Sequence, residues 1–209
     1  MTAPTRRLFQ ALFIAAAALA FAAPAAVRAD AKDDGKALVQ RMADEVVKIL
    51  ATQGIDRAAK EARFRQILAQ NFDVPTIGAW VMGPPWRDAT PAQRAEYLKL
   101  FETYIVKVYT GQLSTYSGEK VTVTGAEADG TGVEVTSRIA DPKNDRTIEL
   151  KWRLRGAGKQ LKVRDVVIEN ISMSQTQRRE FASVFQQRGN SVDGLIAALR
   201  EKIAELDRK

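Results

Sequence analysis

The chain has 209 residues, of which 45% are hydrophobic, 27% charged and 7% aromatic, and its formal net charge is +7. This composition is that of one globular domain with a core, and it excludes a disordered or collagen-like chain. The sequence contains neither His nor Cys, which excludes a Ser-His triad, a Cys nucleophile, a disulfide and a His- or Cys-ligated metal site.

The first 29 residues have the layout of a secretory signal peptide. Arg6 and Arg7 precede an uncharged, alanine-rich run, and a small-x-small cleavage motif ends at Ala29. The two Arg, followed after one residue by Phe, also resemble the twin-arginine export signature. The alternative is an uncleaved membrane anchor, but the run is mostly Ala and is broken by Pro24. We therefore predict cleavage after Ala29 and a single domain over residues 30–209.

Cleavage at this point changes the charge of the chain. The segment removed holds three Arg and no acid, so the net charge falls from +7 to +4. A charge of +4 spread over the mature domain is no nucleic-acid-binding footprint. The sequence therefore predicts an exported protein of the bacterial envelope, with lipids or proteins as partners.

Helical periodicity dominates the first half of the mature chain. Apolar residues recur every three or four positions over 38–50 and 58–68, which predicts two amphipathic helices. Asp73 is expected to cap a short third helix that ends at Met82. Thr90 and Gln93 form a capping box that starts the longest helix, over 91–114. That helix carries one wide apolar stripe, which comprises Tyr97, Phe101, Tyr104, Ile105, Val108 and Tyr109.

From residue 119 the apolar period changes from about 3.6 to 2. Alternating segments separated by turns at 128–130, 141–145 and 156–158 predict an antiparallel meander with one apolar face. The predicted sheet has four strands, with a fifth as the alternative. The apolar run at 166–168 leaves a bulge or the register of the fourth strand open. Ser172 and Ser191 are expected to cap two closing helices. The predicted fold class is α+β, with helices at both ends of the chain.

Several short motifs, taken in order, resemble one known family. These are Trp86–Arg94, the helix residues Phe101, Tyr104 and Tyr109, the turn Tyr116-Ser117-Gly118, the stretch Lys162–Ser172, and Arg179, Phe181 and Ala182. They are similar to the MlaC, or toluene-tolerance auxiliary, family, and the stretch Ser172–Val184 looks most like its hopanoid-associated HpnM branch. One departure is the segment Gly83-Pro84-Pro85-Trp86-Arg87, where the family usually has Gly-Arg-Tyr-Trp-Arg.

The resemblance implies a periplasmic lipid carrier rather than an enzyme, with no cofactor. It implies a cone-shaped fold related to nuclear transport factor 2, in which acyl chains lie between helices and sheet. The implied cargo is a phospholipid or a hopanoid. The implied partners are an outer-membrane lipoprotein complex and an inner-membrane ABC transporter that carries an MCE-domain protein.

Spacing alone favours a filled core between the long helix and the sheet, whereas the resemblance implies a pocket there and gives a set of candidate lining residues. The candidates are Trp80, Val81, Tyr97, Phe101, Tyr104, Ile105, Val108, Val133, Val135, Ile148, Leu150, Trp152 and Leu154.

Cationic side chains supply two further sets of candidates. The first comprises Arg87, Arg178 and Arg179, which could meet a lipid phosphate at the pocket mouth. The second is the cationic face of the strands, with Arg138, Lys151, Arg153, Arg155, Lys162 and Arg164, which is either a solvated surface or a docking patch for an acidic partner.

Two other functions remain open at this point. Asp165, with Tyr104 or Tyr109, could serve an isomerase- or hydratase-like enzyme, or it could be a structural carboxylate. A filled core would instead indicate an envelope adaptor without a ligand.

Overall fold

The computed structural model describes residues 25–52, 54–112, 118–140 and 147–208, and side chains from residue 31 onward. Its elements are α1 (Ala25–Ala51), α2 (Arg57–Asn71), α3 (Val74–Met82), α4 (Pro85–Asp88), α5 (Pro91–Gln112), β1 (Lys120–Asp129), β2 (Gly132–Ala140), β3 (Thr147–Arg155), the 3-10 turn η2 (Gly158–Gln160), β4 (Lys162–Ile168), β5 (Ile171–Ser172), α6 (Met173–Gln187) and α7 (Val192–Asp207). The α+β class and the antiparallel sheet are therefore confirmed.

The predicted helix starts are present as hydrogen bonds. Asp73 accepts from the Thr76 amide (3.3 Å), and the Thr90–Gln93 capping box is closed in both directions, at 2.9 and 3.2 Å. Each bond satisfies an amide that the first helical turn leaves without a partner. Helix α3 ends at Met82 as predicted, with Gly83 as its C-cap, and Pro84 and Pro85 then begin the short helix α4, because a proline suits the first turn of a helix.

The sheet is a five-stranded antiparallel meander in the order β1-β2-β3-β4-β5. The question left open at the fourth strand is resolved by a register shift at Arg164, which lies opposite the Arg153–Leu154 step of β3 and forms a bulge. The turn between β4 and β5 is made by Glu169 and Asn170, both with positive φ, as a two-residue hairpin turn of the primed type requires. The predicted turns at 116–118 and 141–145 lie wholly or largely outside the described residues, as does most of the predicted signal peptide.

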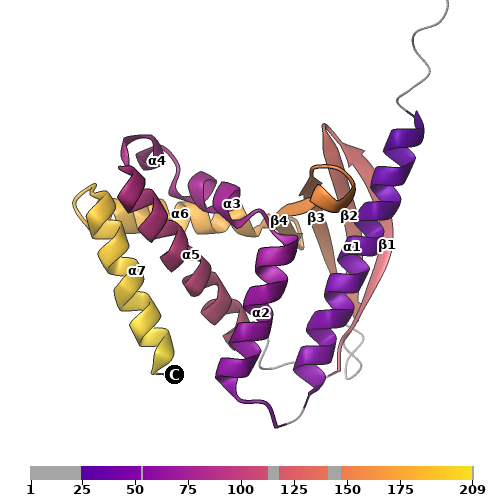
Figure 1. The fold of residues 1–209 in the computed structure, drawn as a ribbon, viewed down its shortest axis with the longest axis horizontal. Helices are drawn as coiled ribbons and strands as arrows, with labels where there is room; N and C mark the ends of the chain where they lie inside the picture. The colour runs from indigo at the N-terminus through magenta and orange to yellow at the C-terminus, as the bar shows by residue number, and fades with distance from the viewer. Residues whose placement is uncertain (1–24, 53, 113–117, 141–146, 209) are drawn as a thin grey trace, which may run out of the picture.

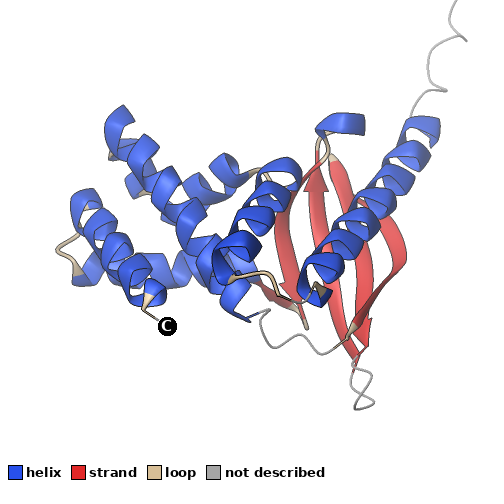
Figure 2. Cartoon of the chain, turned by 60° about the horizontal axis from the view of Figure 1, so that its bottom comes forward, coloured by secondary structure: helices blue, strands red, loops and turns tan. Residues whose placement is uncertain are grey.

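The apolar side chains form two separate cores, which give the molecule a V-shaped outline (Figure 1). In the sheet arm, α1 lies across one face of the sheet, as Figure 2 shows, and Leu38, Val39 and Met42 pack against β2 and β4. In the helical arm, α3, α5, α6 and α7 surround a cluster of aromatic rings. The two arms leave a space between them, and α2 contributes to both cores.

A short backbone contact joins the arms. The link between α2 and α3 runs beside the start of β4, where Phe72 forms a parallel bridge with Val163 and the Asp73 amide donates to the Val163 carbonyl at 3.0 Å. The β4 edge is thus paired at both ends, by this link and by β5. Among the described residues, no helix is both long enough and apolar enough to cross a bilayer.

Candidate functional site: an apolar cavity between the two cores

A cavity of about 470 Å³ lies between the arms, which is within the usual range for small-molecule sites. Helices α1, α2 with its C-cap residue, and α3 contribute Met42, Ala43, Val46, Val47, Leu50, Phe64, Ile67, Leu68, Phe72, Val74, Ile77 and Val81. Helices α5 and α6 contribute Phe101, Ile105, Tyr109, Gln112, Met173, Ser174 and Gln177. The sheet and the residue before it contribute Glu119, Val121, Ile139, Ile148, Leu150, Trp152, Arg164, Asp165, Val166 and Ile168. The wall is therefore almost entirely hydrocarbon.

The cavity stays open because the residues on its two sides pack in separate cores. Met42 and Ile67 belong to the sheet-arm core, while Leu68 and Phe101 belong to the helical core. Gly35 brings the first half of α1 close to the sheet, since a Cβ there would lie 3.1 Å from a Val135 methyl. The second half of the same helix forms the cavity wall instead.

One aromatic residue in the wall has its polar N–H group hydrogen-bonded within the protein. Trp152 lines the cavity, and its indole N–H donates to the hydroxyl of the fully buried Ser137 on the neighbouring strand at 2.9 Å. A buried donor without a partner would favour water inside the cavity. The bond to Ser137 leaves the ring face to present carbon to any occupant.

A few polar side chains also line the cavity. Arg164 is ion-paired with Asp73 at 2.8 Å, and its side chain is 44% exposed. Arg164 thus lines the cavity and also meets solvent. The other polar lining residues are Asp165, Ser174 and Gln177, on β4 and α6, and Gln112 and Glu119, near the end of α5 and before β1.

The comparisons with known proteins agree with this geometry. A family model described as MlaC protein matches residues 40–201. The chain belongs to the MlaC family. A solved structure with the same fold is the phospholipid-binding protein from Ralstonia solanacearum in complex with a phospholipid. It shares 25% sequence identity and a TM-score of 0.68 with this chain, and the match covers 82% of this chain and 98% of that one.

Six of the thirteen lining residues predicted for this MlaC-family chain border the cavity: Val81, Phe101, Ile105, Ile148, Leu150 and Trp152. They come from α3, α5 and β3. The helix stripe was predicted to face the sheet as one surface, and the structure divides it into two. One side of α5, with Ile105 and Tyr109, faces the cavity, while the other packs against α6.

The other seven predicted lining residues lie elsewhere, and the prediction is corrected there. Val133, Val135 and Leu154 are buried in the sheet-arm core under α1. Tyr97 is fully buried among Trp86, Phe101 and Phe181, with its hydroxyl donating to the Gly78 carbonyl. Tyr104 packs on Phe181, and Trp80 is exposed beneath Arg178. Val108 lies half-buried on α5 and does not border the cavity. Alternation shows which residues face inward, but not whether another element covers them.

The walls that sequence reasoning missed come chiefly from α1, α2 and β4. The apolar spacing that predicted the first two helices also marks Met42, Val46 and Leu50 as one face. What the sequence lacks is a signal that this face meets a void rather than the long helix. At β4, the bulge changes which residues face inward, so that Val166 and Ile168 border the cavity.

Of the nine cations proposed to contact a headgroup or a partner, Arg164 borders the cavity and the other eight do not. Arg178 stacks on Trp80, with its guanidinium carbon 4.6 Å from the ring centroid, and donates to the Trp80 carbonyl. Arg179 donates to the hydroxyl of Thr176 on its own helix. Arg87 is exposed on α4.

The cations of β3 are neutralised by acids on neighbouring strands. Lys151 and Arg153 both pair with Glu134, Arg153 also with Asp165, and Arg155 with Asp129. These contacts supply the compensation that three like charges on one strand require. Their use as a partner contact stays a prediction.

Asp165 has the bonding of a structural carboxylate. It accepts from the Ser172 hydroxyl (2.7 Å) and from both the amide and the hydroxyl of Ser174 (3.0 and 2.7 Å), which fixes the start of α6. Burial raises the pKa of the Tyr109 hydroxyl, and nearby Tyr104, Glu180 and Asp165 raise it further. Tyr109 therefore stays protonated at neutral pH, and the Asp165 carboxylate is engaged by three donors at the start of α6.

Proposed function

We propose that this MlaC-family chain is a periplasmic phospholipid carrier, exported by a signal peptide that is cleaved near Asp30. The main support for this proposal is the hydrocarbon-lined cavity of about 470 Å³ between two separately packed cores. Its place in the fold, and the phospholipid bound by the structural neighbour, support this proposal over that of an adaptor with a filled core.

The physical need for a carrier is large. Two acyl chains hold roughly 30 methylenes, each costing about 0.8 kcal/mol in water, so ~24 kcal/mol opposes free transit across an aqueous space. Moving the chains from a bilayer into a hydrocarbon-lined cavity exchanges one apolar medium for another. Transfer then needs no nucleotide, metal or covalent step from the carrier itself.

The route we propose follows the family resemblance. The carrier exchanges lipid with an outer-membrane lipoprotein complex at one end and with the MCE-domain protein of an inner-membrane ABC transporter at the other. A hopanoid is the alternative cargo, since its ring system is equally apolar. Both cargoes rely on the same cavity, and they differ in whether a phosphate is present.

The test is lipid analysis of the protein purified from the periplasm with its own leader. We expect an intact mass that begins near Asp30, and phospholipid in a fixed ratio to protein by mass spectrometry. Ile105→Trp and Leu150→Trp fill opposite walls of the cavity and should reduce bound lipid. Thr122→Trp, on an exposed position of β1, is the matched control and should leave it unchanged.

Two results would contradict the proposal. One is wild-type protein without lipid. The other is undiminished lipid in both cavity variants when circular dichroism shows them to be folded. A hopanoid in place of phospholipid would move the proposal to the alternative cargo.

A further inference from the structure

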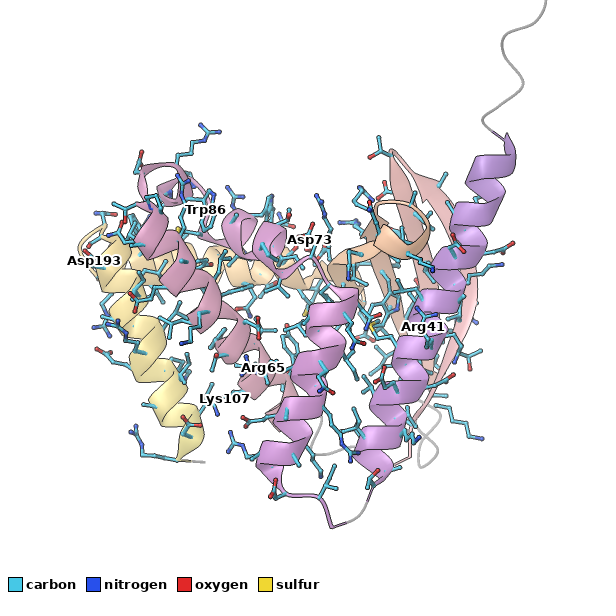
Figure 3. All side chains as sticks on the ribbon, in the orientation of Figure 1. Arg41, Arg65, Asp73, Trp86, Lys107 and Asp193 are labelled. Atoms are coloured by element: carbon cyan, nitrogen blue, oxygen red, sulfur yellow. The ribbon has the colours of Figure 1, made fainter. Side chains whose placement is uncertain are left out.

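The border of the cavity holds a pair of opposite charges, of which the sequence analysis assigned Arg164 only to the cationic strand face. Arg164 is the cation that borders the cavity among the described residues, and its guanidinium is paired with the Asp73 carboxylate at 2.8 Å. In Figure 3, Asp73 lies at the junction between the upper end of α2 and the sheet. The pair thus stands where the two arms meet.

The fold builds this position from two sides. Asp73 is flanked by Phe72 and Val74, both of which line the cavity, and its backbone amide is fastened to the Val163 carbonyl. Arg164 is the bulged residue of β4. Bulges occur often beside functional sites, where they re-aim a side chain.

Both charged groups retain bonding capacity for a ligand. One Asp73 oxygen caps α3 through the Thr76 amide, and the other meets Arg164. A guanidinium carries five N–H donors in a fork that matches phosphate, and among the described residues Asp73 is the acid that engages it. Asp73 and Arg164 are 23% and 44% exposed, so a headgroup can reach both.

We propose that Arg164 and Asp73 form a recognition site for a zwitterionic phospholipid headgroup. Arg164 binds the phosphate diester, while Asp73 accepts from the headgroup's primary ammonium. Resting on the proposed carrier function, this inference deepens it by naming the lipid class. A headgroup with net negative charge is disfavoured, because it brings its phosphate beside Asp73 without an ammonium to compensate.

The test offers delipidated protein vesicles with equal amounts of phosphatidylethanolamine and phosphatidylglycerol carrying identical acyl chains. The bound lipid is counted and its headgroup ratio determined by mass spectrometry. We expect wild type to prefer phosphatidylethanolamine by about two- to fivefold, the range that a partly exposed ion pair provides. A ratio equal to that of the vesicles, with lipid bound, overturns the inference alone. No bound lipid of either kind overturns the proposed function instead.

Variants separate the two contacts. Asp73→Asn keeps the cap of α3, since Asn caps as well as Asp, and should abolish the preference for phosphatidylethanolamine. Arg164→Gln should lower the retention of both phospholipids, and Arg164→Lys should restore part of it. Arg63→Gln, an exposed cation on α2, is the control and should change neither quantity. An unaltered preference in folded Asp73→Asn overturns the assignment.

A free anion is the other possible source of a phosphate group. Titration of delipidated wild type with inorganic phosphate, followed by calorimetry, should show no saturable heat. This is expected because the acyl chains supply most of the binding free energy. Saturable phosphate binding that is lost in Arg164→Gln would overturn the lipid assignment in favour of a phosphate site.

Discussion

The bond between Trp152 and Ser137 allows the wall of the cavity to be tested quantitatively. Ser137 is fully buried, and its hydroxyl accepts from the indole N–H at 2.9 Å. Ser137→Ala removes the acceptor and leaves a donor in an apolar wall. Such a bond contributes about 0.5–1.5 kcal/mol, and an unpaired buried donor costs about 1–3 kcal/mol. We expect a loss of about 1–3 kcal/mol in unfolding free energy.

The assay is urea unfolding followed by far-ultraviolet circular dichroism, in a double-mutant cycle with Trp152→Phe. Phe lacks the N–H, so Ser137→Ala should cost much less in that background. The coupling energy should be about 1 kcal/mol or more. Additive effects of the two substitutions would refute the claim that this bond holds the ring in the wall.

Two further predictions concern the packing of α1 and the response to alkali. Gly35→Leu should destabilise the protein by about 1–3 kcal/mol in calorimetry, because a Cβ there already approaches Val135 at 3.1 Å and Val133 at 3.3 Å; an unchanged Tm would contradict the close packing of α1 on the sheet. A hydrogen bond to Asp207 raises the pKa of Lys107 above its ordinary value of 10.5. The stabilisation from this hydrogen bond is therefore complete below the ordinary lysine pKa and is lost as pH rises through the pKa of the folded state. The free energy of unfolding should fall over this pH range, and Lys107→Met should make that fall shallower. An equally steep loss of unfolding free energy with pH in Lys107→Met would contradict this prediction.

Local sequence signals predicted the elements well, because they depend on neighbours along the chain. Asp73, Thr90 and Ser172 each cap the helix that their spacing indicated. The change of apolar period located the sheet, and alternation gave its inner face. The apolar run at 166–168 indicated a bulge or a change of register in the fourth strand, but it did not show that Arg164 is the bulged residue.

The site was harder to predict than the fold, because a void has no sequence signature. Val135 and Leu150 alternate on adjacent strands with the same inward orientation, yet α1 covers the first while the second borders the cavity. Which inward residue is covered depends on how far α1 extends along the sheet. In the sequence, Arg164 was one of several cations on the strands. It lies beside Asp73 because β4 contacts the link between α2 and α3.

The central claim, that acyl chains occupy the space between the two cores, can be tested with the protein's own fluorescence. Of the three Trp residues, Trp152 lines the cavity, whereas Trp80 stacks under Arg178 and Trp86 packs against Tyr97 in the helical arm. Phospholipid with brominated acyl chains quenches tryptophan only near contact. Loading should therefore quench wild-type emission relative to the unbrominated lipid, and Trp152→Phe should abolish the difference. Equal quenching in Trp152→Phe, or none in lipid-loaded wild type, would contradict the account.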